Sequence, residues 1–232
     1  MGKKIVLGII SALLVAVAFV MCFSAFFFVP TAAAKEIVVV LDAGHGGVDG
    51  GVVGRTTKIK ESDLNLQMAE LMKEKLEGAG LTVVMTRKTK NGLYGHTGTG
   101  MKKRDMQKRK EIILSSSPSL VVSVHQNLYP SPKVRGGQVF YKKDDVFGQA
   151  LATFIQEKLN GFYEDEGVKN RTVTTGDFYI LNCSKAPSVL IECGFLSNEK
   201  DEKLLTSGGT KKQLVSAIVS GILSYLTLEK SV

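Results

Sequence analysis

The amino-acid sequence predicts a single α/β domain whose strands are mostly parallel, preceded by a hydrophobic N-terminal helix. Short β-branched runs alternate with segments of helical period along the chain, which is typical of parallel sheets flanked by helices. The runs are continuously apolar, as strands buried on both faces should be. The chain has 232 residues, 44% apolar and 22% charged, which is a globular composition.

The first 34 residues form a segment of different character. Two lysines precede the uncharged run Ile5–Val29, which is long enough to cross a bilayer as a helix. Pro30 ends the run, and small residues follow it before Lys35, as a signal peptidase requires. We expect residues 1–34 to be a signal peptide or a membrane anchor and residues 35–232 to lie outside the cytoplasm.

Apolar residues that recur with a helical period, and continuous apolar β-branched runs, locate the helices and strands of the domain. We expect strands at Ile37–Leu41, Leu81–Met85, Leu120–His125, Gly137–Lys142, Phe178–Leu181 and Ser188–Glu192. We expect helices from Ser62 or Asp63 to Gly78, from Arg109 to Ser115, from Asp144 or Asp145 to Leu159, and from Lys211 to Leu228. Residues 161–176 are too polar to assign, and the polar loop 88–108 is long enough to form a substrate wall.

Side chains that bind metals or move protons stand where three of the apolar runs end. His45 follows the first run in a glycine-rich turn, while His125 and Glu192 end two later runs. Parallel strands gather their carboxyl ends at one edge of a sheet, so these residues can meet in one cleft. Two imidazoles and a carboxylate suit a catalytic zinc ion, and a further carboxylate can transfer protons. With Glu61 at the start of a helix, the sequence predicts a zinc hydrolase.

Each residue also has a simpler interpretation. A histidine between glycines can be an ordinary turn residue, and Glu61 fits the general preference of helix N-termini for acidic side chains. Glu192 is more informative, because a carboxylate at the end of a buried strand is costly unless it is paired, bound to a metal or catalytic.

Four motifs carry a family resemblance. They are Val40–Gly47 (VLDAGHGG), Glu61, Ser123–Asn127 (SVHQN) and Ile191–Asn198 (IECGFLSN). Their order and spacing resemble the zinc N-acetylmuramoyl-L-alanine amidases of the Amidase_3 type. The resemblance extends from about Ile37 to the C-terminal helix.

The resemblance implies one zinc ion held by His45, Glu61 and His125, with Glu192 as the catalytic residue. It also implies a mixed six-stranded sheet flanked by helices, and peptidoglycan as the substrate, cleaved between the lactyl group and L-alanine. The hydrophobic N-terminus and the lack of wall-binding repeats are typical of the germination-specific amidases of spore formers. That narrower resemblance implies a role in the spore cortex, in muramic-δ-lactam formation, and the family often has activating protein partners.

Two places depart from the family pattern. Gln126 stands where a small residue is usual, and Ile113-Leu114 replaces the Ala-Asn pair that normally follows Arg109. We expect these changes to affect substrate contacts near the cleft and to leave the metal ligands intact.

Three polar residues are further candidates for substrate contacts. Arg87 and Arg109 can pair with carboxylates of the stem peptide, although structural ion pairs are an equal alternative. Asn127 can orient His125 through a hydrogen bond or simply form a turn. We expect Asp42 to be a structural acceptor and His96 to be a surface histidine.

The formal net charge is +8, which favours anionic wall polymers, peptide carboxylates or lipid headgroups as partners outside the cytoplasm. The basic stretch 102–110 has no interleaved aromatic residues, so a solvated helix face is favoured over a nucleic-acid site. Cys183 and Cys193 are either two buried apolar side chains or a disulfide pair.

Two other functions remain open from the residues alone. A His-Glu-His zinc site also suits a peptidase that trims stem peptides. The second alternative is a membrane-tethered wall-binding protein whose metal is structural, although Glu192 argues against it because closed structural zinc sites need no additional carboxylate.

Overall fold

The computed structural model describes residues 2, 8, 17, 19 and 36–229. The chain divides into two compact units, Met1–Lys35 and Glu36–Val232. Apart from the four residues named, the predicted signal or anchor segment lies outside the described residues. None of the helices in the described part of the chain combines the length and the hydropathy of a membrane span.

The second unit is built on a six-stranded sheet with the strand order β2-β1-β3-β6-β4-β5. The strands are β1 (Val38–Ala43), β2 (Thr82–Met85), β3 (Leu120–Asn127), β4 (Gln138–Tyr141), β5 (Thr174–Thr175) and β6 (Ser188–Phe195). β4 runs antiparallel to β6, and all other neighbouring pairs are parallel. The predicted mixed, mostly parallel sheet of six strands is therefore confirmed.

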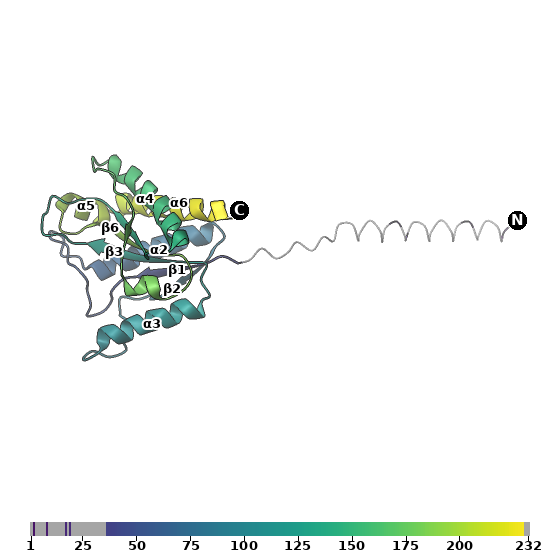
Figure 1. Cartoon of the computed structure of the whole chain (residues 1–232), viewed down its shortest axis with the longest axis horizontal. Coiled ribbons are helices and arrows are strands. Elements are labelled where there is room, and N and C mark those ends of the chain that lie inside the picture. The colour runs from purple at the N-terminus through teal and green to yellow at the C-terminus, as the bar shows by residue number, and fades with distance from the viewer. Residues whose placement is uncertain (1, 3–7, 9–16, 18, 20–35, 230–232) are drawn as a thin grey trace. The chain divides into compact units, whose positions relative to one another are not determined.

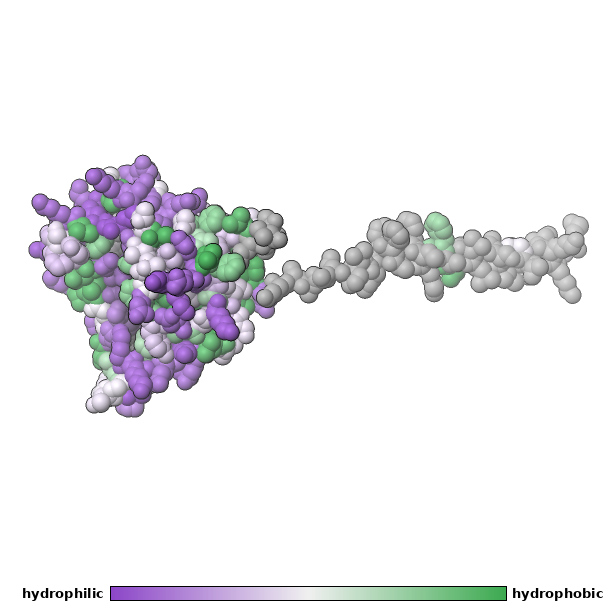
Figure 2. Space-filling view, in the orientation of Figure 1, coloured by the Kyte–Doolittle hydropathy of each residue, from purple (hydrophilic) through white to green (hydrophobic). Residues whose placement is uncertain are grey.

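Helices cover both faces of this sheet. They are α2 (Glu61–Gly78), α3 (Met101–Ser115), α4 (Val146–Glu164), α5 (Glu199–Thr206) and α6 (Gly208–Glu229), with the short 3₁₀ helix η1 at Tyr179–Asn182. Figure 1 shows α4 and α6 on one side of the sheet and α3 on the other. The outer face seen in Figure 2 is mainly hydrophilic, with small separate apolar patches.

The core is divided unequally between the two faces. Val39 and Leu41 of β1 belong to the larger cluster, which also contains the buried side chains of α2, α4 and α6. Val40 belongs to a smaller cluster with Ile113 of α3 and residues of η1. Each fully buried aliphatic side chain contributes about 1.5–3 kcal/mol, so most of the packing energy lies on the α2, α4 and α6 side. The α3 side has room for polar groups and a cavity.

Two helices begin elsewhere than predicted. α3 starts at Met101 rather than Arg109, because its inward face carries the buried charges of Asp105 and Arg109, which interrupt the apolar period. α2 starts at Glu61, and its N-cap is Lys60 without a side-chain cap, not Ser62 or Asp63. The earlier start of α3 shortens the predicted polar loop 88–108, because residues 101–108 belong to the helix.

The strand predicted at Phe178–Leu181 is wrong, because this segment forms η1. β5 lies inside the segment that was too polar to assign, and α5 was not predicted. The predicted N-cap at Asp145 is confirmed, because its side chain accepts a 2.8 Å hydrogen bond from the Gly148 amide. The predicted C-terminal helix is also confirmed. Cys183 and Cys193 are both free and buried.

Candidate active site

His45 stands directly after β1 in a strained turn. Its backbone φ is 60°, a left-handed conformation that is uncommon for a residue other than glycine. Asp49 accepts at 2.8 Å on the Nδ1 side of the imidazole. This contact fixes the ring so that Nε2 points at Glu61, 3.4 Å from its Oε1. Asp49 was not predicted, since only the folding of the glycine-rich loop brings it back to the ring.

Glu61 is the first residue of α2 and is 2% exposed. Its Oε1 lies 2.9 Å from His125 Nδ1, and its Oε2 accepts at 2.9 Å from the Val52 amide. Burial alone would raise the pKa of Glu61, but hydrogen bonds from His125 and His45 outweigh it and hold the pKa well below its usual range. Glu61 is therefore ionised at neutral pH.

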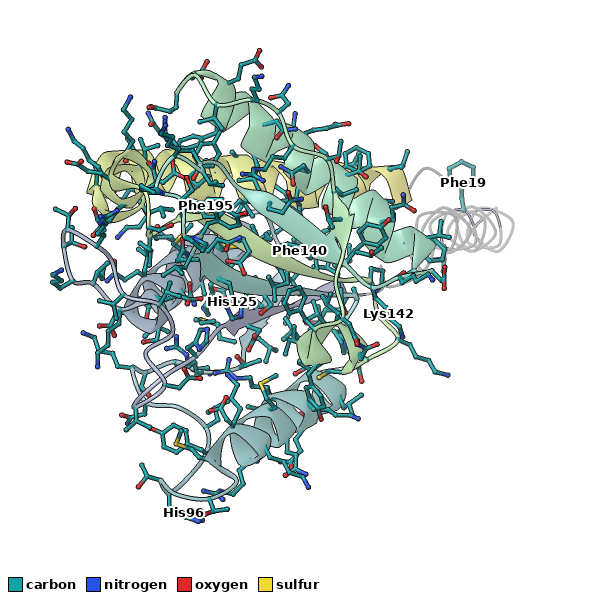
Figure 3. All side chains as sticks on the ribbon, turned by 60° about the vertical axis from the view of Figure 1, so that its left-hand side comes forward. Phe19, His96, His125, Phe140, Lys142 and Phe195 are labelled. Atoms are coloured by element: carbon teal, nitrogen blue, oxygen red, sulfur yellow. The ribbon has the colours of Figure 1, made fainter. Side chains whose placement is uncertain are left out.

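His125 approaches the same point from β3. Its ring centroid lies 5.0 Å from that of His45, with the rings edge to face. Gly44 makes this approach possible, because a Cβ at that position would lie 2.2 Å from His125 Cε1. Figure 3 shows His125 beside the sheet and His96 at the periphery of the domain, in agreement with the predicted surface position of His96.

His45, Glu61 and His125 form a group whose ligand atoms lie within 4.8 Å of one another. Two imidazole nitrogens converge on one carboxylate oxygen, which is the donor set of hydrolytic zinc sites. The three residues present therefore fit a divalent metal. The approach of His45 and His125 agrees with the expectation from the strand ends, and Glu61 joins them from the start of α2.

Glu192 lies next to His125, because β3 and β6 pair in the register that places these two residues opposite each other. Its Oε2 is buried and has no hydrogen-bond partner among the described residues. Burial raises the pKa of Glu192 to about 7, the charges of His125 and Glu61 acting in opposite directions. A carboxyl group that titrates near neutrality is suited to general acid–base work.

A cavity of about 360 Å³ joins these residues. Its lining comes from β1, β3, α3, η1 and β6 and from the turn after β1, and it includes His45, His125 and Glu192. Glu61 lies behind the two histidines rather than in the lining. The metal-binding group and the acid–base residue therefore share one space that opens to solvent.

The raised pKa of Glu192 makes a prediction about the metal-free protein. Between pH 4.5 and about 7, Glu192 is protonated in the folded state and ionised in the unfolded state. The stability that the neutral carboxyl group provides is therefore fully present below pH 4.5 and is lost as pH rises through 7. Glu192→Gln removes this dependence. At pH 8 we expect metal-free Glu192→Gln to be more stable than wild type by about 1–3 kcal/mol, and near pH 4.5 to differ by less than about 0.5 kcal/mol. Urea unfolding at both pH values measures this, and equal stabilities at pH 8 would contradict it.

Arg87 and Arg109, the two arginine candidates for substrate contacts, are engaged inside the domain. Arg87 is 2% exposed, and its guanidinium donates to backbone carbonyls of Ala43, Gly44, Ser62 and Thr89. Arg109 is 1% exposed and pairs with Asp42 and Asp105. These contacts favour the structural alternative for both residues, and a contact with the stem peptide stays a prediction.

Asn127 accepts the Leu128 amide at 2.8 Å through its Oδ1, which favours the turn role over the orientation of His125. Asp42 accepts from Thr86, Ser123 and Arg109, so its predicted role as a structural acceptor is confirmed.

Gln126 lies on the other face of β3 from His125. Its Nε2 donates to Asn65 Oδ1 at 3.1 Å, and Asn65 in turn donates to Glu61 Oε1 at 3.3 Å. The prediction that this departure affects substrate contacts is not favoured by the geometry, because Gln126 supports Glu61 from behind instead.

Comparison with known proteins agrees with this geometry. Residues 39–224 match the family model Amidase_3, N-acetylmuramoyl-L-alanine amidase. The chain belongs to this family. Its members hydrolyse the amide between muramic acid and L-alanine in peptidoglycan, so the chain is an amide hydrolase of the Amidase_3 family. Neither the peptidase nor the non-catalytic alternative agrees with this membership.

Several relatives resemble the chain over most of its length. It is 35% identical to the germination-specific N-acetylmuramoyl-L-alanine amidase of Bacillus subtilis (strain 168), covering 82% of this chain and 80% of the relative. The CwlD amidase from Clostridioides difficile, solved in complex with the GerS lipoprotein, superimposes with a TM-score of 0.79 at 37% identity, over 83% of this chain and all of that one. The catalytic domain of CwlV from Bacillus (Paenibacillus) polymyxa gives 0.70 at 28% identity, over 83% and 99%.

Proposed function

We propose that the chain is a zinc-dependent Amidase_3 enzyme in which His45, Glu61 and His125 hold one zinc ion and Glu192 is the catalytic residue. The observation that carries the proposal is Oε2 of Glu192, which is buried and has no hydrogen-bond partner among the described residues, in a side chain that lies opposite His125 and lines the same cavity as both histidines. A buried carboxyl oxygen without a partner is costly in a purely structural role. It is expected where the partner is a reacting molecule.

The metal ligands and Glu192 have different roles in the proposed amide hydrolysis. A zinc ion bound by the three ligands would polarise the scissile carbonyl and acidify a water molecule. Glu192 removes a proton from the attacking water and delivers it to the departing alanine nitrogen, which is otherwise a poor leaving group. Glu61 stays ionised, and Asp49 keeps Nε2 of His45 directed at the centre. Such outer contacts orient ligands and strengthen metal binding.

The substrate is proposed to be spore-cortex peptidoglycan, in a reaction that leads to muramic-δ-lactam and supports germination. Support comes from the likeness to the germination-specific amidase of B. subtilis and to the CwlD amidase of C. difficile. The latter was solved with a lipoprotein, which supports an activating protein partner for this chain as well. No nucleic acid is involved in this proposal.

Residues 1–34 are proposed to direct the domain across the membrane, either as a cleaved signal peptide or as an uncleaved anchor on the outer face. Support comes from the uncharged run that follows two lysines, and from the wall substrates of the family. Residues 35–232 would then be the catalytic domain.

Metal removal tests the proposed chemistry. We expect a chelator to abolish hydrolysis of peptidoglycan by the full chain, and one equivalent of zinc to restore it, because the carbonyl and the water are both activated at the metal. Mass spectrometry of the digest should show muramic acid with a free lactyl carboxylate and peptides that begin with alanine. The assay is run with and without candidate partner proteins. Cleavage only within the stem peptide, or full activity without metal, would contradict the proposal.

A further inference from the structure

The cavity beside Glu192 has an apolar wall along one side. Its side chains come from α3, η1 and β6, and they are Met106, Phe178, Tyr179, Ile180 and Leu190. Phe178 and Tyr179 remain partly exposed at the surface. Covering such a wall is favourable by roughly 25 cal/mol per Å² of apolar surface, so the wall suits methyl groups close to the scissile amide.

Charged side chains also line the cavity, and most are engaged inside the domain. Arg109 pairs with Asp42 and Asp105 at 2.6 Å each, and all three are buried. Asp105 also accepts the Leu93 amide at 2.6 Å. These three groups therefore bind one another and hold the walls of the cavity, with little capacity left for a ligand.

Lys102 is in a different situation. It is the second residue of α3, lines the same cavity, and its side chain is 65% exposed. Its Nζ contacts Asp49 Oδ2 at 3.0 Å, and no second acceptor is found for it in the described part of the chain. An ammonium group has three N–H donors, so Lys102 can bind a further anion without breaking an existing contact.

The position of this charge relative to the reacting centre is set by Asp49. The Asp49 carboxylate contacts Lys102 through Oδ2 and the His45 imidazole through Oδ1. The ammonium is therefore separated from His45 by two hydrogen bonds and one carboxylate. An extended peptide advances about 3.3–3.6 Å per residue, so a group within the first few residues beyond the scissile bond can reach the ammonium.

We propose that Lys102 is a specificity-determining residue that binds the free carboxylate of the second stem-peptide residue, while the lactyl and alanine methyl groups contact the apolar wall. This inference rests on the proposed amidase function. The preferred substrate class is muramoyl peptides whose second residue is an acid, over the same peptides amidated at that position. Arg109 and Arg87 cannot supply this charge without leaving their internal partners.

Two muropeptides of equal length test the proposal, one with glutamate and one with isoglutamine as the second residue. We expect the wild-type chain to favour the acid in kcat/KM by about three- to fivefold, the range of a partly exposed ion pair. Lys102→Gln should lose this preference by slowing only the acid, and Lys102→Arg should keep it. Zinc content is measured for every variant.

Lys103→Gln is the matched control, because Lys103 is the next residue on α3, is exposed and does not line the cavity. It should keep the wild-type preference. The proposal is overturned if wild type cleaves both muropeptides equally. It is also overturned if Lys102→Gln slows both to the same extent with less bound zinc, which would mean that Lys102 acts through Asp49 and His45. If wild type with bound zinc cleaves neither muropeptide nor peptidoglycan, the proposed function itself fails.

Discussion

Glu192→Gln is expected to abolish turnover while the fold and the zinc content stay unchanged. Glutamine has the shape of glutamate but cannot accept the proton of the attacking water, and loss of a general base typically costs about 10²–10⁴ in rate. Glu192 is not in the group whose ligand atoms converge on one point, so the metal should be retained. The measurement is kcat on peptidoglycan fragments together with metal analysis of the purified protein.

Glu157→Gln is the control for this variant, because Glu157 is an exposed residue of α4 and no cavity residue. It should behave as wild type in both measurements. Turnover by Glu192→Gln within about threefold of wild type would rule out proton transfer by this residue, since that falls far short of the loss of a general base. Loss of zinc together with turnover would instead make Glu192 part of the metal site.

The main parts of the site were predictable because they depend on simple rules. His125 and Glu192 both end apolar runs, and parallel pairing places them opposite each other at one edge of the sheet. His45 follows a third such run. Glu61 was a weaker case, because an acidic residue at a helix start is common. It becomes informative only together with the two histidines and through the family resemblance, and in the structure both histidines lie close to its Oε1.

The supporting contacts could not be predicted, because they join residues through loops without periodicity. Asp49 reaches His45 only when the glycine-rich loop folds back on itself, in a turn closed by hydrogen bonds between Gly46 and Asp49. Asn65 supports Glu61 from one turn further along α2, and Gln126 supports Asn65 from β3. The sequence alone does not indicate which hydrogen-bond partner a polar side chain has in the folded domain.

The two wrongly predicted elements, α3 and the segment Phe178–Leu181, both lie beside the cavity. α3 was predicted eight residues too short because its buried positions include the charged Asp105 and Arg109, so an apolar period is visible only near Ile113. The segment Phe178–Leu181 is apolar enough for a strand, yet it packs as a 3₁₀ turn over the α3 face of the sheet. In both cases the inward side is built around the cavity rather than around an ordinary core.

Arg109→Met is expected to be the most destabilising single substitution on the α3 side of the domain. Arg109 holds Asp42 and Asp105 at 2.6 Å each and also donates to the His45 carbonyl. Removing one partner of a buried ion pair leaves an uncompensated charge and costs about 3–5 kcal/mol. Urea unfolding at pH 7 measures the loss, and Lys108→Gln, an exposed position on the same helix, should change stability by less than about 0.5 kcal/mol.

The pH dependence distinguishes this cause from a simple packing defect. Burial alone would raise the pKa of Asp42, but Arg109 and the neighbouring hydroxyls lower it to about 2, so its stabilising effect is present above pH 3.8 and is lost as pH falls through 2. Without Arg109, burial prevails and the pKa of Asp42 rises above its usual range. The difference in unfolding free energy between wild type and Arg109→Met therefore decreases as pH falls from 7 towards 4, because Asp42 takes up a proton in the variant. A second substitution, Asp42→Asn, should recover part of the loss at pH 7. A deficit that stays constant over this range would mean that lost packing, not the unpaired charge, destabilises the variant.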